Sequence, residues 1–293
     1  MYELIQAGER TWYINSPAKM GIFKINEQEV CLIDSGNDKE AGRKINKLLE
    51  ANHWTLAGII NTHSNADHIG GNKFLQQKTG CKIISTDIEN TFARHPILEP
   101  SFLYGGYPFK GLRNKFLMAQ PSEPTYNIDD HLPEGLEYFR LGGHYLDMIG
   151  IKTADDICFL ADCVFGENIL DKYHLSFVYD AEAFLATLDF VEQLEAKLFV
   201  PAHAEACEDI RPLVKVNRDK VYEIMDRILT ICSMPLCFED ILQAVFDHYE
   251  LTMDFNQYVL VGSTVRSYLS YLYDQGKMTC EIKDNKMLWQ TMA

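Results

Sequence analysis

The sequence predicts a layered α/β fold, because short apolar runs alternate with longer segments of helical periodicity. Apolar runs of strand length lie at residues 21–25, 30–33, 58–61, 82–84, 149–152, 157–160 and 198–200. Between them, residues 39–51 place Ile45, Leu48 and Leu49 at helical spacing, residues 181–197 repeat this pattern, and residues 72–79 follow a turn as a further predicted helix. Apolar residues form 47% of the 293 residues, which suffices for a substantial core and for two domains.

Residues 95–132 interrupt this alternation with a segment rich in Pro, Gly and aromatic side chains. The segment is too apolar for a solvated linker, so we expect it to cover a site, to form an interface or to pack on its own domain. Arg94, Lys110, Arg113 and Lys115 offer contacts to an anion there.

The composition changes near residue 210, which divides the chain into a first domain, 1–212, and a small second domain, 213–293. Helices are predicted over 217–232, 238–249 and 259–275, followed by two short strands within 277–289, an order that resembles a winged helix. From residue 215 onward, 8 Lys and Arg face 11 Asp and Glu, a net charge of −3, and the predicted recognition helix offers only Arg266. Nucleic-acid binding is therefore disfavoured, and we expect this domain to pack on the first or to pair subunits.

The overall composition indicates a cytoplasmic protein. The formal net charge of −15 argues against a phosphate-backbone partner. No run reaches eighteen apolar residues, and the first residues lack the basic and apolar regions of a secretory signal. The eight Cys are scattered without CxxC pairs, as is usual for thiols in a reducing compartment.

The residues most informative about function lie between the predicted strand at 58–61 and the predicted helix at 72–79. The sequence there reads Thr62-His63-Ser64-Asn65-Ala66-Asp67-His68-Ile69-Gly70-Gly71. Imidazole and carboxylate are ligands that Zn, Fe and Mn prefer, and a strand-to-helix turn aims several side chains at one point. The segment therefore predicts a metal site.

This segment resembles the signature of the metallo-β-lactamase superfamily, T-H-x-H-x-D-H-x-G-G, with Asn65 where the second His is expected. Four further stretches match in order: Leu-Ile-Asp-Ser-Gly at 32–36, Gly-Gly-His at 142–144, Leu-Ala-Asp at 160–162 and Pro-Ala-His at 201–203. The matches cover about the first 210 residues. The resemblance implies an αββα sandwich with a metal groove at one edge, between the two sheets.

The resemblance also implies two adjacent metal sites that share a carboxylate. Site one would have His63, Asn65 and His144 as ligands, site two would have Asp67, His68 and His203, and Asp162 would bridge them. An amide oxygen is neutral and a weak donor to Zn, so Asn65 weakens site one. We expect one or two Zn ions, with a single tight ion at site two favoured and with Fe or Mn as alternatives.

The activity that the resemblance implies is that of a metal-dependent hydrolase. A metal-activated water would attack the carbonyl of a small thioester, ester or lactone, and Asp67 would be the catalytic residue that orients this water. Asp34 is expected to support a ligand His from behind, because such imidazoles donate their other N–H to an oxygen. Tyr173 and His174 are candidates for lining the substrate site.

Two other functions remain open at this stage. A subgroup of metallo-β-lactamases carries Asn at the position of Asn65 and works with one Zn, but His63, His144 and Asp162 also form the set that non-haem iron dioxygenases use. A non-catalytic regulatory protein that acts through its C-terminal domain is the second alternative. The substrate and the oligomeric state, including a homo-oligomer, are not determined by the sequence.

Overall fold

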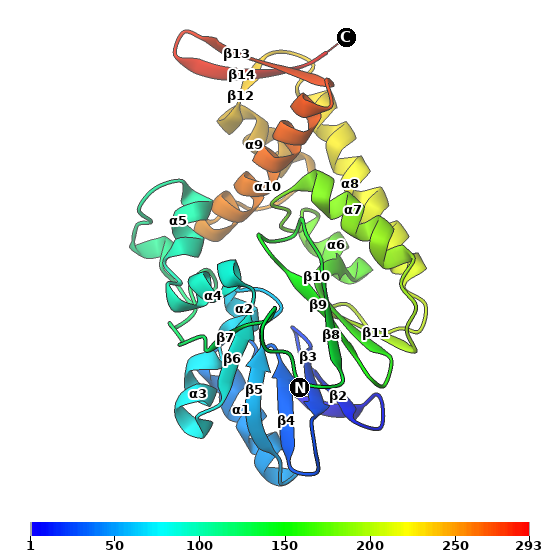
Figure 1. Ribbon diagram of the computed structural model, residues 1–293. Coiled ribbons are helices and arrows are strands. Elements are labelled where there is room, and N and C mark those ends of the chain that lie inside the picture. Colours follow the sequence, from blue (N-terminus) through cyan, green and yellow to red (C-terminus); the bar gives the residue numbers. More distant parts are fainter. Residues whose placement is uncertain (1, 293) are drawn as a thin grey trace.

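A computed structural model describes residues 2–292 and shows two β-sheets packed face to face, with helices on both outer faces (Figure 1). The first sheet contains strands in chain order, namely β1 (Glu3–Gln6), β2 (Thr11–Asn15), β3 (Met20–Lys24), β4 (Glu29–Ile33), β5 (Thr55–Ile60), β6 (Lys82–Ser85) and β7 (Tyr126–Asn127). The second has the order β11 (Leu198–His203), β10 (Ile157–Phe165), β9 (Ile149–Thr153) and β8 (Leu136–Arg140). The predicted αββα sandwich is confirmed.

The layers form because the buried strands are apolar on both faces. In β4, Val30 and Leu32 belong to the cluster that includes Ile45 and Leu49 of helix α1 (Lys39–Ala51). The alternate residues of β4 belong to the cluster between the two sheets, together with side chains of β9, β10 and β11. Side chains that alternate along a strand thus bury against a helix on one side and against the other sheet on the opposite side.

Three further helices cover the outer faces. Helix α3 (Asn72–Thr79) packs beside α1 on the first sheet, and α7 (Ala181–Glu192) and α8 (Arg211–Ile231) lie against β10 of the second. The predicted helix over 181–197 ends earlier, at Glu192, because residues 194–196 form a loop that leads into β11. Asn217 of α8 holds the end of β10, donating to the carbonyl of Phe165 and accepting from its N–H, both at 2.9 Å.

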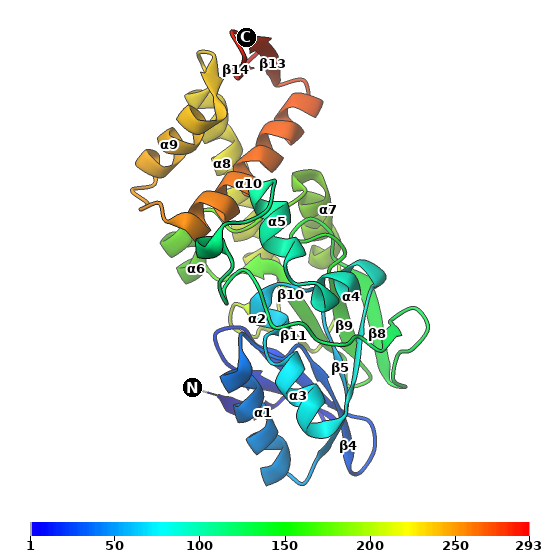
Figure 2. The same cartoon turned by 90° about the vertical axis from the view of Figure 1, so that its left-hand side faces the viewer.

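Residues 95–132 contain more regular structure than their composition predicts. Helix α5 (Leu98–Tyr104) and the 3₁₀ turn η1 (Lys110–Leu112) lie here, preceded by α4 (Asp87–Arg94). Leu103, Leu112 and Leu117 pack on Val259 of helix α10 (Phe255–Asp274), so the segment lies between the sandwich and the C-terminal helices (Figure 2).

The C-terminal region contains α8, β12 (Leu236–Cys237), α9 (Phe238–His248), α10, β13 (Met278–Lys283) and β14 (Lys286–Thr291). The three strands form a separate sheet in the order β12-β14-β13, of which β12 was not anticipated. One hydrophobic cluster continues from Leu160 of β10 through Ile224 of α8 to Leu269 of α10. The predicted boundary at 212/213 falls in the first turn of α8, and both this division and the winged-helix resemblance stay predictions.

Among the helices of residues 2–292, none combines the length and the apolar character that a membrane span requires.

The fold predicts one severely destabilising substitution. Gly143 has φ +104°, and an added Cβ would lie 2.1 Å from the backbone nitrogen of Phe184 in α7. We expect Gly143→Ala to lower the free energy of unfolding by about 3 kcal/mol or more, because the added Cβ would clash with the backbone of α7, which the surrounding core holds in place. Gly80→Ala is the control: its φ is +73°, nothing lies within 4 Å, and a loss of about 1 kcal/mol follows from strain alone. Urea denaturation of both variants measures the difference, and equal losses would refute the packing argument.

Candidate metal centre

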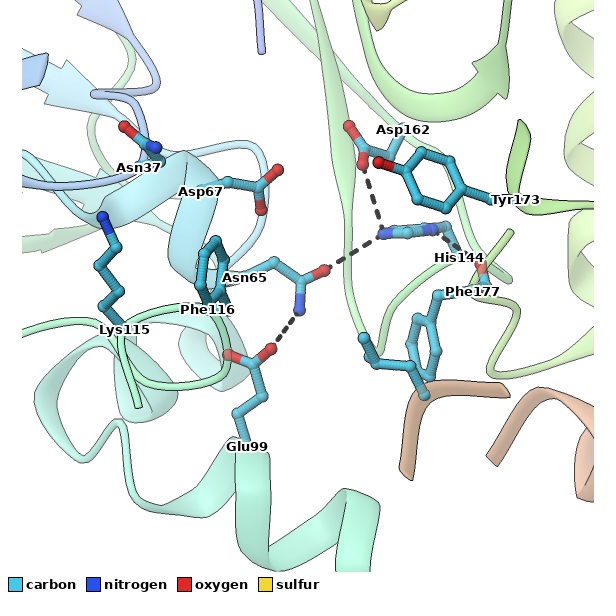
Figure 3. Close-up of a pocket in the computed structure, with 11 residues that line it drawn as sticks. Asn37, Asn65, Asp67, Glu99, Lys115, Phe116, His144, Asp162, Tyr173 and Phe177 are labelled. Atoms are coloured by element: carbon cyan, nitrogen blue, oxygen red, sulfur yellow. Dashed lines mark hydrogen bonds and ion pairs between the residues drawn. The ribbon is translucent and has the colours of Figure 1, made fainter. Parts of the chain in front are cut away.

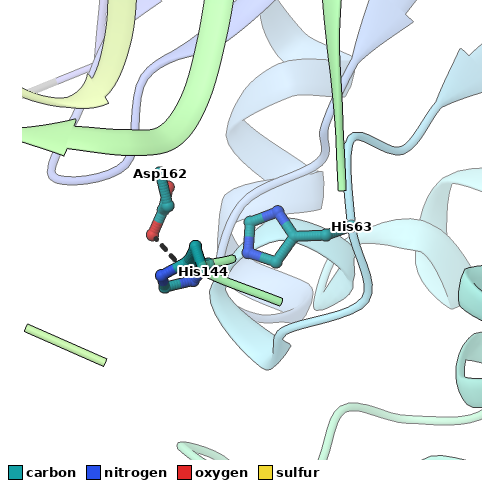
Figure 4. A group of neighbouring side chains, drawn as sticks. All are labelled: His63, His144 and Asp162. Carbon is teal, nitrogen blue, oxygen red and sulfur yellow. Dashed lines mark ion pairs between the residues drawn. The ribbon is translucent and has the colours of Figure 1, made fainter. Parts of the chain in front are cut away.

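Four imidazoles and two carboxylates meet at one edge of the sandwich, where the chain leaves its strands. The residues are His63 after β5, Asp67 and His68 in the short helix α2 (Ala66–Ile69), His144 between β8 and β9, Asp162 in β10, and His203 at the end of β11. Their donor atoms form two groups, in each of which all ligand atoms lie within 4.8 Å of one another. One group contains His63, His144 and Asp162 (Figure 4), and the other contains Asp67, His68 and His203.

Hydrogen bonds at Asp34 fix the orientation of two of these imidazoles. His68 donates from Nδ1 to Asp34 Oδ2 over 2.8 Å. The Thr62 hydroxyl also donates to Asp34 Oδ2, at 2.7 Å, so it accepts from His63 Nδ1, 3.1 Å away. In their neutral forms, both rings therefore carry their proton on Nδ1 and present an Nε2 lone pair to the site. Asp34 thus lies where it was predicted to support a ligand His.

Backbone carbonyls fix the other two rings in the same way. His144 Nδ1 lies 2.9 Å from the carbonyl oxygen of Phe177, and His203 Nδ1 lies 3.1 Å from that of Pro17. A carbonyl oxygen only accepts, so both Nδ1 atoms carry the proton. All four Nε2 atoms consequently face the same space, and each offers a lone pair there when its ring is neutral.

Asp162 is buried among these lone pairs. Its carboxylate lies 3.0 Å from His68 Nε2, 3.2 Å from His203 Nε2 and 3.7 Å from His144 Nε2. A bulge directs it there, because the register of β10 against β11 shifts on both sides of Ala161, whose φ is +49°. Bulges of this kind commonly re-aim a side chain beside a functional site.

The carboxylates need a cation nearby. Burial by itself would lower the pKa of His203, but Asp162 and Asp67 outweigh it and raise this pKa to about 10. The pKa of His68 is likewise raised against burial by Asp162, Asp34 and Asp67. Burial and the neighbouring His68 lower the pKa of His63, so this ring stays neutral and available as a ligand.

The separations of the donor atoms fit metal coordination. Ligand atoms about 2.0 Å from a tetrahedral ion lie about 3.3 Å from one another. His203 Nε2 lies 3.3 Å from Asp67 Oδ2, and His144 Nε2 lies 3.2 Å from Asn65 Oδ1. Among residues 2–292, His63 Nε2 is buried and has no hydrogen-bond partner, and a metal ion would bind its lone pair. The residues present therefore fit a divalent metal.

Two buried glutamates beside the site were not anticipated. Glu89 of α4 accepts from the N–H and hydroxyl of Ser64 and from the N–H of Asp147, which ties the loop of His63 to the loop that follows His144. Glu99 of α5 accepts from the Asn65 side-chain amide at 2.8 Å. Burial raises the pKa of Glu89 to about 7 and raises that of Glu99 well above its usual range. Neither glutamate belongs to a motif with ligand spacing, so the sequence carries no signal for them.

A cavity of about 360 Å³ opens onto the ligands (Figure 3). Lys115, Phe116, Tyr173, Phe177 and Leu260 line it together with the polar residues of the site. Tyr173, a predicted lining residue, thus borders the cavity.

His174, the other predicted lining residue, does not border this cavity. Helix α6 (Glu167–Tyr173) ends just before it, and its φ of +56° turns the ring away to stack on Tyr249 at 4.9 Å.

Comparison with known families identifies the class of protein. The family model described as "Metallo-beta-lactamase superfamily" matches residues 21–203, which is more than half of the chain. The chain belongs to the metallo-β-lactamase superfamily, as its signature predicted, and a divalent metal is implied by this membership.

Curated relatives match only in part. A hydroxyacylglutathione hydrolase of Bradyrhizobium sp. (strain ORS 278) is 51% identical over 45 residues, 15% of this chain and 17% of that protein. One of Brucella ovis is 32% identical over 96 residues, 32% of this chain and 36% of that protein. The matches thus span about a third or less of the length of these relatives.

Solved structures match over nearly the whole chain. A β-lactamase domain protein from Burkholderia ambifaria superposes with a TM-score of 0.75 at 15% identity, covering 99% of this chain and 94% of that chain. A metallo-β-lactamase family protein from Thermus thermophilus gives 0.71 at 17% identity, covering 97% and 99%. At these identities the likeness shows the fold alone.

The buried Glu89 predicts a pH dependence of stability. Its pKa of about 7 in the folded chain exceeds the ordinary value of 4.5, so its contribution is complete below pH 4.5 and is lost as the pH rises through 7. The loss is on the order of 3 kcal/mol. Glu89→Gln should remove this part of the slope. Urea denaturation of chelator-treated wild type and variant between pH 4.5 and 8 measures the difference, and parallel curves would contradict the assignment.

Proposed function

We propose that the protein is a zinc-dependent hydrolase that cleaves small thioesters or esters. The observation that carries this proposal is the convergence of four imidazoles with Asp162 and Asp67 in two adjacent groups of donor atoms. Bound there, a divalent metal lowers the pKa of water and polarises a carbonyl. The names of the partial relatives, hydroxyacylglutathione hydrolases, favour a thioester among the candidate substrates.

Asp67 and Asp162 differ in a way that supports separate roles. The Asp162 side chain is 6% exposed and faces three imidazoles, so it acts as a ligand. The Asp67 side chain is 43% exposed and borders the cavity, while its Oδ2 lies 3.3 Å from His203 Nε2. One carboxylate oxygen of Asp67 therefore remains available to orient a water and to accept its proton. The catalytic role of Asp67 is part of the proposal.

The cavity suits a substrate with a carbonyl and a modest apolar group. Its polar lining includes Asp67, His144 and Asp162, and its apolar lining includes Phe116, Phe177 and Leu260. Lys115, which also lines the cavity, has its Nζ 3.3 Å from Asp38 Oδ2, so this carboxylate balances much of the lysine charge. We infer that the apolar part of this lining, more than charge, holds the substrate beside the metal centre.

A dioxygenase is the second candidate, favoured by the grouping of His63, His144 and Asp162 alone. This set of two imidazoles and one carboxylate suits Fe(II) with open positions. Iron in the purified protein and consumption of O₂ with substrate would select it over hydrolysis.

His203→Ala should remove both the metal of site two and the turnover of thioesters, because site two then keeps one imidazole. Metal per chain and hydrolysis of a thioester panel are measured on the same preparations. His95→Ala, at an exposed position, serves as the control and should change neither. A His203→Ala protein that turns over without metal would refute the proposed hydrolase.

Asn65→His should raise the metal content of protein purified without added metal from near one ion per chain towards two. The substitution places an imidazole where the Asn65 amide oxygen lies 3.2 Å from His144 Nε2, and imidazole is the stronger donor to Zn. Elemental analysis checks this. Unchanged stoichiometry would show that Asn65 does not limit the occupancy of site one.

A further inference from the structure

The Asn65 side chain bridges the metal centre and helix α5. Its Oδ1 lies 3.2 Å from His144 Nε2, and its Nδ2 lies 2.8 Å from Glu99 Oε1 (Figure 3). Glu99 is 4% exposed, and its carboxyl accepts a hydrogen bond from Asn65, which lies in the loop between β5 and α2. A buried carboxyl that accepts from the Asn65 amide favours the orientation in which Nδ2 points to Glu99 and Oδ1 points away from it.

The tautomer of His144 makes this orientation informative. Because His144 Nδ1 donates to the carbonyl of Phe177, its Nε2 has a lone pair. The Asn65 Oδ1 facing it also has lone pairs only, so the two atoms repel each other unless they share a cation. His63, whose Nε2 has no hydrogen-bond partner among residues 2–292, belongs with His144 and Asp162 to a group whose donor atoms lie within 4.8 Å of one another.

We propose that Glu99 is a positioning residue that holds the Asn65 amide oxygen toward site one, where it serves as an oxygen ligand for a second, weakly bound divalent metal. The Asn65 amide N–H donates to Glu99, which leaves Oδ1 directed at the site. Site one then has two nitrogen and two oxygen donors, a set that binds Mn²⁺ or Co²⁺ as well as Zn²⁺. The inference rests on the proposed metal-dependent function, but it concerns binding and not turnover.

The opposite amide orientation makes a different prediction. With its amide reversed, Asn65 would donate to His144 Nε2 and accept from a protonated Glu99. The lone pair of His144 would then be occupied, and site one would bind no metal. The number of ions that the wild-type protein binds therefore separates the two arrangements.

The test is a titration with Co²⁺ of the full chain stripped of metal by a chelator, followed by visible absorption. We expect the wild type to bind two equivalents, the second more weakly. Glu99→Met keeps the length of the side chain and removes the acceptor, and it should weaken the second equivalent about tenfold or more while leaving the first unchanged. Glu99→Gln keeps an acceptor oxygen and should stay within about threefold of the wild type.

A double-mutant cycle tests whether Glu99 acts through Asn65. Asn65→Leu should weaken the second equivalent, and adding Glu99→Met to it should weaken binding no further. Ser101→Ala lies in the same helix and removes a hydroxyl that donates to the carbonyl of Ile97, so it is the control for disturbance of α5 and should bind as the wild type does.

Three results would overturn the inference: a single Co²⁺ equivalent in the wild type, unchanged binding in Glu99→Met, or a Glu99→Gln protein as weak as Glu99→Met. If Glu99→Met does not fold, solvent exchange of the ¹⁵N-labelled Asn65 side-chain amide decides, with its signal assigned by its loss in Asn65→Leu. Fast exchange refutes the bond to Glu99. Slow exchange that persists in His144→Ala supports this bond, because a reversed amide would donate to His144. If the wild type and the variants bind Co²⁺ as expected but the wild type hydrolyses no thioester or ester, this inference is retained and the proposed hydrolase is refuted.

Discussion

The buried carboxylate of Asp162 is the constraint on which the site depends. A charge buried at this depth is costly unless cations or donors surround it. Three imidazole Nε2 atoms face it within 3.0–3.7 Å, and each ring is held by an acceptor at its Nδ1. The acceptors keep the inward nitrogens free of protons in the neutral rings. A metal ion then satisfies the carboxylate and the lone pairs together.

The sandwich produces this arrangement by bringing the ends of strands from both sheets to one edge. Asp34 and His63 follow the parallel strands β4 and β5, and Asp162 and His203 lie near the ends of the parallel strands β10 and β11. The close approach of backbones around the site adds rigidity. An added Cβ at Gly70 would lie 2.2 Å from the carbonyl carbon of Asn37, and one at Gly71 would lie 2.3 Å from the carbonyl oxygen of Ser35, which explains the glycine pair that ends the motif.

The fold and the grouping of the candidate ligands were accessible from the sequence, because they leave periodic or spaced signals. His63, Asp67 and His68 share one turn, whereas His144, Asp162 and His203 were assigned through the order of the family motifs. Glu89 and Glu99 leave no such signal, because their contacts depend on how α4 and α5 fold over the ligand loop. The direction of His174 depends on a single residue at the end of α6, which periodicity does not encode.

Asn65 stands where an imidazole would complete the set of His63 and His144, and we propose that it makes the two metal sites unequal. Elemental analysis of protein purified without added metal or chelator tests the central claim most directly. The account predicts near one zinc ion per chain, held at site two by Asp67, His68 and His203. Protein that contains no metal, even after incubation with Zn²⁺, would contradict it.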